Sequence, residues 1–258
     1  MSDIYNDQSY VANNPQLHRE DSAFKFEQIA GLLEQIQIHE NRIKILDVGG
    51  GAGVLGGMAA EYFTGKGVGV EFVALDLSAE MLGVQAQSNP HIVRIWNCSV
   101  VDCPEKEFDL VLMIDVIEHI QNKDMAANRL NEIGKNVIYN IPIQINVVDL
   151  LRNAVNRGLY YSEQTRLIGH VHFFSYASAR RFVDRHHHRI VSSFKPYCVL
   201  MLGSRDLQYV ELRKGRVRLA EVKISCWIAK YLPWLAPWVV QGSMFTLVSR
   251  KPEIAPKR

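Results

Sequence analysis

The chain has little of what marks several large classes of protein. Its 258 residues include only four cysteines, and no two of them form a C-x-x-C pair. This usage predicts neither a zinc site nor a disulfide framework, and it favours the reducing cytoplasm as the location. The first ten residues are polar and contain no apolar run, so we expect no signal peptide.

A strong net charge and a long hydrophobic run are also missing. The formal net charge is only +2, so the overall field is too weak to attract nucleic acid, and no nucleic-acid partner is expected. The most apolar late stretch, residues 226–240, is too short to span a bilayer and contains a lysine and two prolines. Hydrophobic residues still make up 48% of the chain, which is enough for a sizeable core.

Segments typical of strands and helices alternate through the first half of the chain. Helices are predicted at 54–65, 78–88 and 124–134, between strands at 42–49, 67–76, 92–98, 110–114 and 136–142. This order predicts a doubly wound, mostly parallel α/β sheet. Two later apolar segments, 189–201 and 243–251, predict an antiparallel pair at its edge, which gives a Rossmann-like sheet of about seven strands.

The stretch KILDVGGGAGVLGG fits two nucleotide-binding patterns at once. Gly51, Gly53 and Gly56 spell G-x-G-x-x-G, the dinucleotide fingerprint, which predicts an NAD(P)-dependent oxidoreductase. Asp47 and the glycines at 49, 51 and 53 spell D-x-G-x-G-x-G, which is similar to the first motif of S-adenosylmethionine-dependent methyltransferases. The two patterns imply different chemistry, so other residues have to decide between them.

Asp47 favours the methyltransferase pattern. It ends the first predicted strand, where the pyrophosphate of a dinucleotide would lie close and a carboxylate would repel it. S-adenosylmethionine has no phosphate and carries a positive amine and sulfonium, which a carboxylate suits. Gly56 is then left for close packing between helix and strand. Asp76, at the end of the second predicted strand, suits the ribose of either cofactor and does not discriminate.

Three further segments, ALDLSAEML, FDLVLMIDVIEHI and GHVHFFSYASARRFV, strengthen this resemblance. Together with the glycine stretch they resemble the small-molecule branch of the class I S-adenosylmethionine-dependent methyltransferases, over about residues 13–200. The resemblance implies S-adenosyl-L-methionine as the cofactor. It also implies methyl transfer to an oxygen, nitrogen or carbon atom of a small-molecule, glycan or lipid-like acceptor. A protein that keeps the fold only to bind the cofactor is a further alternative.

The resemblance and the strand-end positions together give the predicted cofactor residues. Ser99 stands where the family often has an acid for the adenine amino group, and Asp115 either faces the cofactor or caps the next helix. The full set is Asp47, Gly49, Gly50, Gly51, Gly53, Asp76, Leu77, Met81, Ser99, Val100 and Asp115.

Three histidines are candidates for the base that takes a proton from the acceptor. His119 follows Glu118 on the loop predicted after the fourth strand. His170 and His172 alternate, so they share one face if their segment is extended. Each also has a structural alternative, as a packed histidine or as a loop residue bonded to backbone. No acidic third partner lies near the pair in sequence, so no metal site is predicted.

These assignments set the expected organisation of the chain. An N-terminal arm and helix occupy 1–40, the S-adenosylmethionine-binding core 41–200, an insertion or lid 201–242, and the last strand with a basic tail 243–258. The first helix is predicted at 22–38 with Ser22 as its N-cap. The charged residues near Ser22 either cap this helix or close over the cofactor.

Residues 213–240 combine basic residues with three tryptophans and a tyrosine. This composition suits a peripheral membrane contact or a lipid-linked acceptor. It also suits a lid or a homodimer interface, in which the same aromatic side chains would be buried. The protein is therefore expected in the cytoplasm, with association to a membrane as the alternative.

Overall fold

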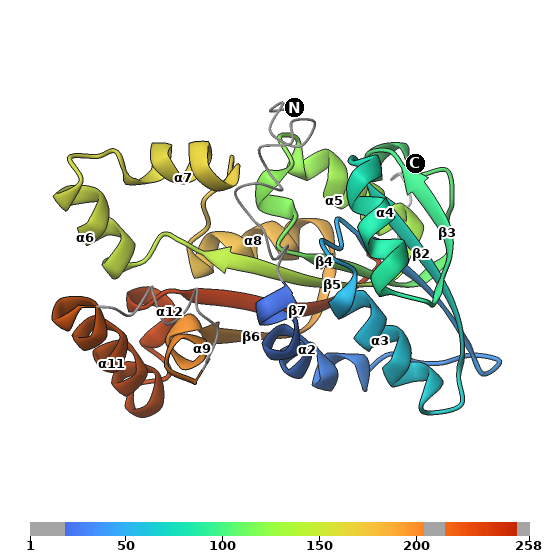
Figure 1. Ribbon diagram of the computed structural model, residues 1–258, viewed down its shortest axis with the longest axis horizontal. Helices are drawn as coiled ribbons and strands as arrows, with labels where there is room; N and C mark the ends of the chain where they lie inside the picture. The colour runs from blue at the N-terminus through green and yellow to red at the C-terminus, as the bar shows by residue number, and fades with distance from the viewer. Residues whose placement is uncertain (1–18, 204–214, 252–258) are drawn as a thin grey trace, which may run out of the picture.

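A seven-stranded sheet forms the centre of the protein, in the order β3-β2-β1-β4-β5-β7-β6 (Figure 1). This computed structural model describes residues 19–203 and 215–251. The strands are β1 (Arg42–Val48), β2 (Gly69–Asp76), β3 (Ile92–Asn97), β4 (Phe108–Ile114), β5 (Gly134–Ile143), β6 (His188–Pro196) and β7 (Gly242–Ser249).

The strand directions confirm the predicted fold class. β1 to β5 pair in parallel, whereas β7 pairs antiparallel with both β5 and β6. The antiparallel strand β7 therefore lies second from one edge of the sheet, between β5 and the outermost strand β6. Strand order reverses between β1 and β4, which is where open α/β sheets bind ligands.

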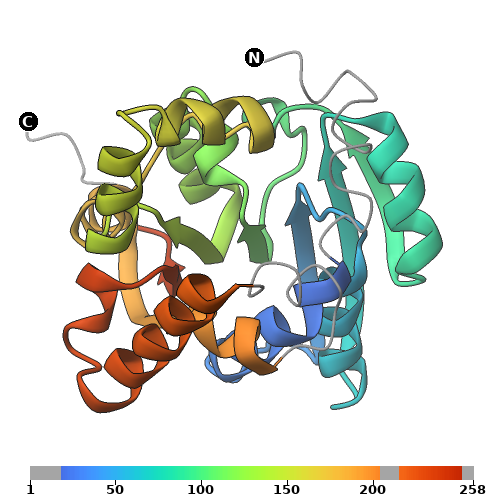
Figure 2. The ribbon, with the colours of Figure 1, turned by 60° about the vertical axis from the view of Figure 1, so that its left-hand side comes forward.

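Helices cover both faces of the sheet (Figures 1 and 2). α2 and α3 lie on one face, and α5 and α8 lie on the other. α4 packs against β2 and β3. Their bounds are α2 (Arg19–Leu33), α3 (Val54–Thr64), α4 (Ala79–Ser88), α5 (Lys123–Ile133) and α8 (Tyr176–His186).

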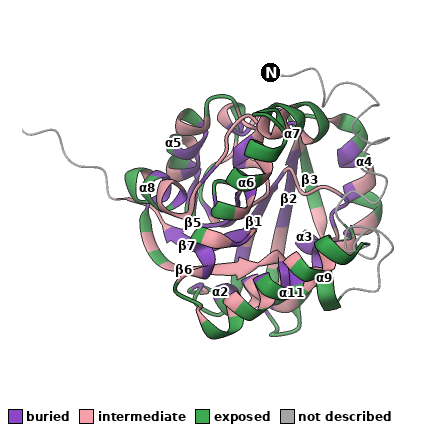
Figure 3. Cartoon of the chain, turned by 90° about the vertical axis from the view of Figure 1, so that its left-hand side faces the viewer, coloured by how far each residue is buried: buried purple, intermediate pink, exposed green. Residues whose placement is uncertain are grey.

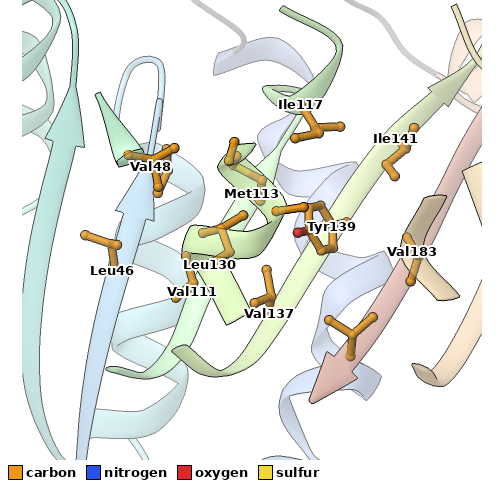
Figure 4. Close-up of a cluster of buried hydrophobic side chains, with 14 of the residues drawn as sticks. Leu46, Val48, Val111, Met113, Ile117, Leu130, Val137, Tyr139, Ile141 and Val183 are labelled. Carbon is orange, nitrogen blue, oxygen red and sulfur yellow. The ribbon is translucent and has the colours of Figure 1, made fainter. Parts of the chain in front are cut away.

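Alternation along the central strands builds a separate core on each face. In β1, Ile43 and Ile45 pack with α2 and α3, whereas Leu46 and Val48 belong to the cluster on the other face (Figure 4). Successive side chains of a strand point to opposite faces, so a strand covered on both sides needs a continuous apolar run. That requirement explains why these strands could be recognised from the sequence.

Two short turns and several further helices follow the strands in sequence. After β3 and β4 come two 3₁₀ turns, η2 (Val100–Asp102) and η3 (Ile117–His119). The segment after β5 contains two helices joined by turns and irregular stretches. Within residues 19–203 and 215–251, the remaining helices are α6 (Val147–Val155), α7 (Tyr160–Ile168), α9 (Tyr197–Gly203), α11 (Arg216–Tyr231) and α12 (Ala236–Val239).

Two predicted boundaries were wrong. α2 already includes Arg19 and ends at Leu33, so Ser22 lies inside the helix and does not cap it. The apolar spacing misled because Ile36 packs into the core from beyond the helix end. The strand predicted over 189–201 stops at Pro196, which has no N–H for the ladder, and the chain turns into α9.

Some predictions cannot be compared with the structure. The arm expected before residue 19, and Arg213 and Lys214 of the basic segment, lie outside the described residues. Within 19–203 and 215–251, no helix combines the length and the apolar character needed to cross a membrane.

Candidate functional site

Glycines shape the turn that joins β1 to α3. Gly49, Gly51 and Gly53 have φ angles of 64°, 55° and 78°, in the region that side chains rarely adopt. Gly53 also lies close to α4, because a Cβ there would come 3.0 Å from the Cα atom of Gln85. The N–H of Gly49 donates to the carbonyl of Leu75, 2.8 Å away, and so ties the turn to β2.

Asp47 lies beneath this turn and is only 3% exposed. Its Oδ2 atom occupies the space that a Cβ on Gly50 or Gly56 would need. Burial raises the pKa of Asp47 to about 7, and the nearby Asp76 adds to the rise. The predicted packing role of Gly56 fits this arrangement, since a Cβ there would also come 2.8 Å from the ring of Phe72.

A cavity opens over the turn, at the carboxyl ends of β1 and β4. This position is the point of strand reversal, where ligands of such sheets bind. The cavity is lined by the glycine turn, the start of α2 and the end of β4, namely Ser22, Lys25, Asp47, Gly49, Gly50, Gly51, Ala52, Leu55, Ile114 and Asp115.

A buried ion pair between Lys25 and Asp115 connects α2 to this cavity. The Nζ atom of Lys25 lies 2.7 Å from Oδ2 of Asp21 and 2.7 Å from Oδ2 of Asp115. Burial alone would lower the pKa of Lys25, but the carboxylates of Asp115 and Asp21 raise it above its usual value. Asp115 also accepts a hydrogen bond of 2.7 Å from Asn140. Asp115 lines the cavity, and the residue at the N-cap position of η3 is Val116.

Asp76 lies at the end of β2, as predicted. Its Oδ1 accepts from the N–H of Ser78 at 2.9 Å, and its Oδ2 accepts from Gln85 at 3.3 Å. Burial raises the pKa of Asp76, and these hydrogen bonds counteract the rise. The carboxylate is thus held in place beside the glycine turn, and its role toward the cofactor stays a prediction.

The other predicted cofactor residues lie along β2, α4 and η2. Leu77 is exposed, and Met81 is buried in a small cluster with Ala52 of the turn. Ser99 caps η2 by accepting from a backbone N–H, and Val100 is buried in the core. Contact of the adenine with Ser99 and Val100 is untested and stays a prediction.

Two of the candidate histidines meet at one place, and Glu118 joins them. Oε1 of Glu118 lies 4.0 Å from Nε2 of His119 and 4.0 Å from Nε2 of His170. The two imidazole rings stack edge to face, with centroids 4.6 Å apart. The sequence analysis missed this acidic partner of His170, because the contact depends on how the loop before α8 folds back.

His172 has a different setting from His170. Its Nε2 lies 3.0 Å from the carbonyls of both Ile120 and Gln121, to which it can donate. The structure therefore gives this ring backbone partners on the loop after η3, and a role as the base stays untested.

Sequence reasoning also missed Asn140 and Gln144. Asn140 lies near the end of β5, and Gln144 directly follows that strand. They hydrogen-bond to Asp115 and His170, respectively. Polar residues at the carboxyl end of a central parallel strand are the signal that could have found both.

This sheet order, with a glycine turn after β1 and an acid after β2, defines a class I S-adenosylmethionine-dependent methyltransferase fold. A family model described as a methyltransferase domain matches residues 19–192. The chain belongs to this methyltransferase family, and its cofactor is S-adenosylmethionine. The NAD(P) alternative is therefore set aside.

Solved structures share this fold at low sequence identity. Phosphoethanolamine N-methyltransferase 2 of Haemonchus contortus, in complex with S-adenosyl-L-methionine, is 18% identical with a TM-score of 0.52, over 88% of this chain and 53% of its own. This chain thus spans about half the length of that enzyme. The N-methyltransferase NodS of Bradyrhizobium japonicum is 9% identical with a TM-score of 0.51, over 95% of this chain and 100% of its own.

A third similar structure is that of a protein with a different activity. The [4+2]-cyclase SpnF is 12% identical with a TM-score of 0.55, over 87% of this chain and 81% of its own. At such identities the likeness shows the fold alone. No curated protein matches this sequence closely enough to count as a relative.

Proposed function

We propose that this protein catalyses methyl transfer from S-adenosylmethionine to an oxygen, nitrogen or carbon atom of a small-molecule, glycan or lipid-like acceptor. The observation that carries the proposal is the cavity at the strand reversal, with the buried Asp47 at its base and Lys25 and Asp115 on its wall. Methyl transfer needs a cofactor held rigidly and an open side from which the acceptor can attack.

The residues at the cavity fit S-adenosylmethionine. The absence of side chains at Gly49 and Gly51 leaves backbone at the surface, so a ligand can approach closely. A side chain at Gly49 would also clash with Val116, at 2.9 Å. We assign the Asp47 carboxylate to the ammonium group of the cofactor and the Asp76 carboxylate to its ribose hydroxyls.

When bound, S-adenosylmethionine supplies an electrophilic methyl group on a sulfonium. The chain has to orient the acceptor on the far side of that methyl group and, for an O–H or N–H acceptor, receive its proton. Products are then the methylated acceptor, S-adenosylhomocysteine and one proton. His119 and His170 lie next to the buried carboxylate of Glu118, which supports a role for them in binding or deprotonating the acceptor.

A lipid-like acceptor is supported by apolar side chains that two helices, α6 and α11, leave exposed to solvent. α6 exposes Leu150, Leu151 and Val155, and α11 exposes Trp227 and Tyr231. Figure 3 shows α6 and α11 on the face turned toward the viewer. Helices with exposed apolar and aromatic residues can rest in a membrane interface. Flotation with anionic vesicles tests this contact, and a protein that stays at the bottom of the gradient contradicts it.

Calorimetry with S-adenosylmethionine and NAD tests the cofactor site. We expect binding of S-adenosylmethionine and none of NAD, and loss of binding in Asp47→Ala. Asp102→Ala is the matched control, because it removes a carboxylate from η2 that does not line the cavity. Unchanged affinity in Asp47→Ala would refute the assignment.

Release of S-adenosylhomocysteine separates an enzyme from a protein that only binds the cofactor. Acceptors bearing hydroxyl, amine or lipid groups are incubated with the protein and S-adenosylmethionine. Acceptor-dependent release supports methyl transfer and names the acceptor class. Binding of the cofactor without release for any acceptor class would favour the non-catalytic alternative.

A further inference from the structure

Glu118, His119 and His170 converge with the spacing of a metal site. One ligand atom from each lies within 4.8 Å of the others, and both histidine Nε2 atoms are 4.0 Å from Oε1 of Glu118. Ligand atoms on one tetrahedral ion, with bonds of about 2.0–2.2 Å, are roughly 3.3–3.6 Å apart. Side-chain shifts of about 1 Å or less would therefore close the three ligands around an ion.

The Glu118 side chain is the strongest sign that a cation is needed here. It is 0% exposed, and neither carboxylate oxygen has a hydrogen-bond partner in the part of the chain that the structure describes. Burying a carboxylate in this way is costly unless a cation or donors compensate it. Burial and the nearby Asp115 raise the pKa of Glu118 well above its usual value, and the residue's own N–H and Lys25 offset only part of this rise. An ion between Glu118 and the two imidazoles would supply the missing charge.

The Nδ1 atoms of His119 and His170, which are not the atoms nearest Glu118, both have hydrogen-bond partners. Nδ1 of His119 lies 3.1 Å from the carbonyl oxygen of Gly169, and Nδ1 of His170 lies 2.8 Å from Oε1 of Gln144. Both partners are acceptors, so each Nδ1 carries the proton and each Nε2 presents a lone pair toward Glu118. Metal-binding histidines are typically oriented in this way by a second hydrogen bond.

Backbone hydrogen bonds hold the two segments together before any ion binds. The carbonyl of Glu118 accepts from the N–H groups of Val171 and His172, at 2.9 and 3.0 Å. Thr165 donates to the carbonyl of His170 at 2.8 Å. The ligands on η3 and on the loop before α8 are thus arranged in advance, which lowers the entropy cost of binding an ion.

We propose that Glu118, His119 and His170 bind a divalent transition-metal ion beside the cofactor cavity. Two imidazoles and one carboxylate suit zinc, iron, manganese, cobalt or nickel better than magnesium or calcium. Three protein ligands leave at least one position open for an exogenous oxygen. The two histidines are then ligands and not general bases.

The open position gives the ion a function that rests on the proposed methyl transfer. A hydroxyl group of the acceptor bound there would have a lowered pKa and lose its proton to water. Its oxygen lone pair then forms the new bond to the methyl carbon, and the electron pair of the broken C–S bond stays on sulfur. The ion changes neither charge nor oxidation state. The acceptor class is therefore an alcohol or phenol.

Titration of the chelator-treated full-length protein with Co²⁺ tests the site without any acceptor. We expect one equivalent to bind at micromolar concentration, with visible d–d absorption of a nitrogen- and oxygen-bound ion and displacement by Zn²⁺. Glu118→Gln and His170→Asn should weaken binding by more than about 100-fold, and Gln144→Leu by about 10–100-fold through the lost outer hydrogen bond. Circular dichroism confirms that each variant is folded.

His186→Asn is the matched control. His186 also contacts a carboxylate, Asp124 at 2.8 Å, and begins a run of three histidines that could bind metal adventitiously. Binding kept in this variant and lost in His170→Asn supports the proposal. No stoichiometric binding, or binding lost only in His186→Asn, overturns it. Calorimetry on the same samples measures the binding of S-adenosylmethionine, so failure of the metal site can be distinguished from failure of the proposed cofactor site.

Discussion

Replacing Asp47 by asparagine should stabilise the protein while removing cofactor binding. Burial raises the pKa of this carboxyl from 3.8 to about 7. The folded protein therefore resists ionisation of Asp47, and stability is lost as the pH rises from the unfolded value toward 7. The difference of about three pH units corresponds to roughly 4 kcal/mol of lost stability above pH 7. Asparagine cannot ionise and avoids this loss.

The pH dependence isolates the effect of the charge. The wild type loses roughly 1–2 kcal/mol through Asp47 at pH 5 and roughly 4 kcal/mol at pH 8. Any crowding of the asparagine amide against Gly50 and Gly56 is common to both conditions. The gain of Asp47→Asn should therefore be about 2–3 kcal/mol larger at pH 8, or roughly 4–12 °C in melting temperature.

Urea unfolding and thermal melts of the wild type and Asp47→Asn at pH 5 and pH 8 measure this difference. Asp102→Asn serves as the control for the loss of one carboxylate from the surface. A gain for Asp47→Asn that is no larger at pH 8 than at pH 5 would refute the reasoning. Calorimetry on the same variant should show that S-adenosylmethionine binding is lost, since the amide carries no charge for the ammonium group.

Three further predictions follow from the same region. The affinity for S-adenosylmethionine should rise about tenfold between pH 6 and pH 8 as Asp47 ionises, and calorimetry showing a flat profile would contradict this. Gly56→Ala should cost about 1–3 kcal/mol in urea unfolding because its Cβ has no room, whereas Gly83→Ala on α4 meets nothing within 4 Å and should stabilise by up to about 1 kcal/mol. Lys25→Met should cost about 3–5 kcal/mol because it leaves the buried carboxylates of Asp115 and Asp21 without their cation, and adding Asp115→Asn should restore part of this loss. Equal losses in both variants would argue against the ion pair.

The fold was predictable because its signals are local. The central strands contain apolar runs, as at residues 110–114 of β4, and the turn after β1 needs glycines that stand close together in sequence. Helix starts also have local signals, since Ser78 accepts from the N–H of Met81 and Ser175 forms a capping box with Ser178. The domain boundaries at residues 40, 200 and 242 stay predictions.

In the candidate site, the residues that could be predicted are those that stand at the end of a strand. Asp47 and Asp115 follow directly from the ends of β1 and β4. The partners of these residues come from distant segments, as with Lys25 on α2, and no local pattern encodes such a contact. The pairing of Glu118 with His170 depends in the same way on backbone hydrogen bonds in an irregular loop, which leaves no periodic signal.

The segment between β5 and α8 leaves the sheet and returns to it at nearly the same point. Ile143 pairs with Phe174, and the N–H groups of Gln144 and Ile145 both donate to the carbonyl of Phe174 at 2.9 Å. α6 and α7 therefore form an excursion with closed ends. Such an excursion can change in length and sequence with little effect on the strands and helix that flank it. We therefore expect an exchange of residues 147–168 to leave the sheet and the glycine turn after β1 in place.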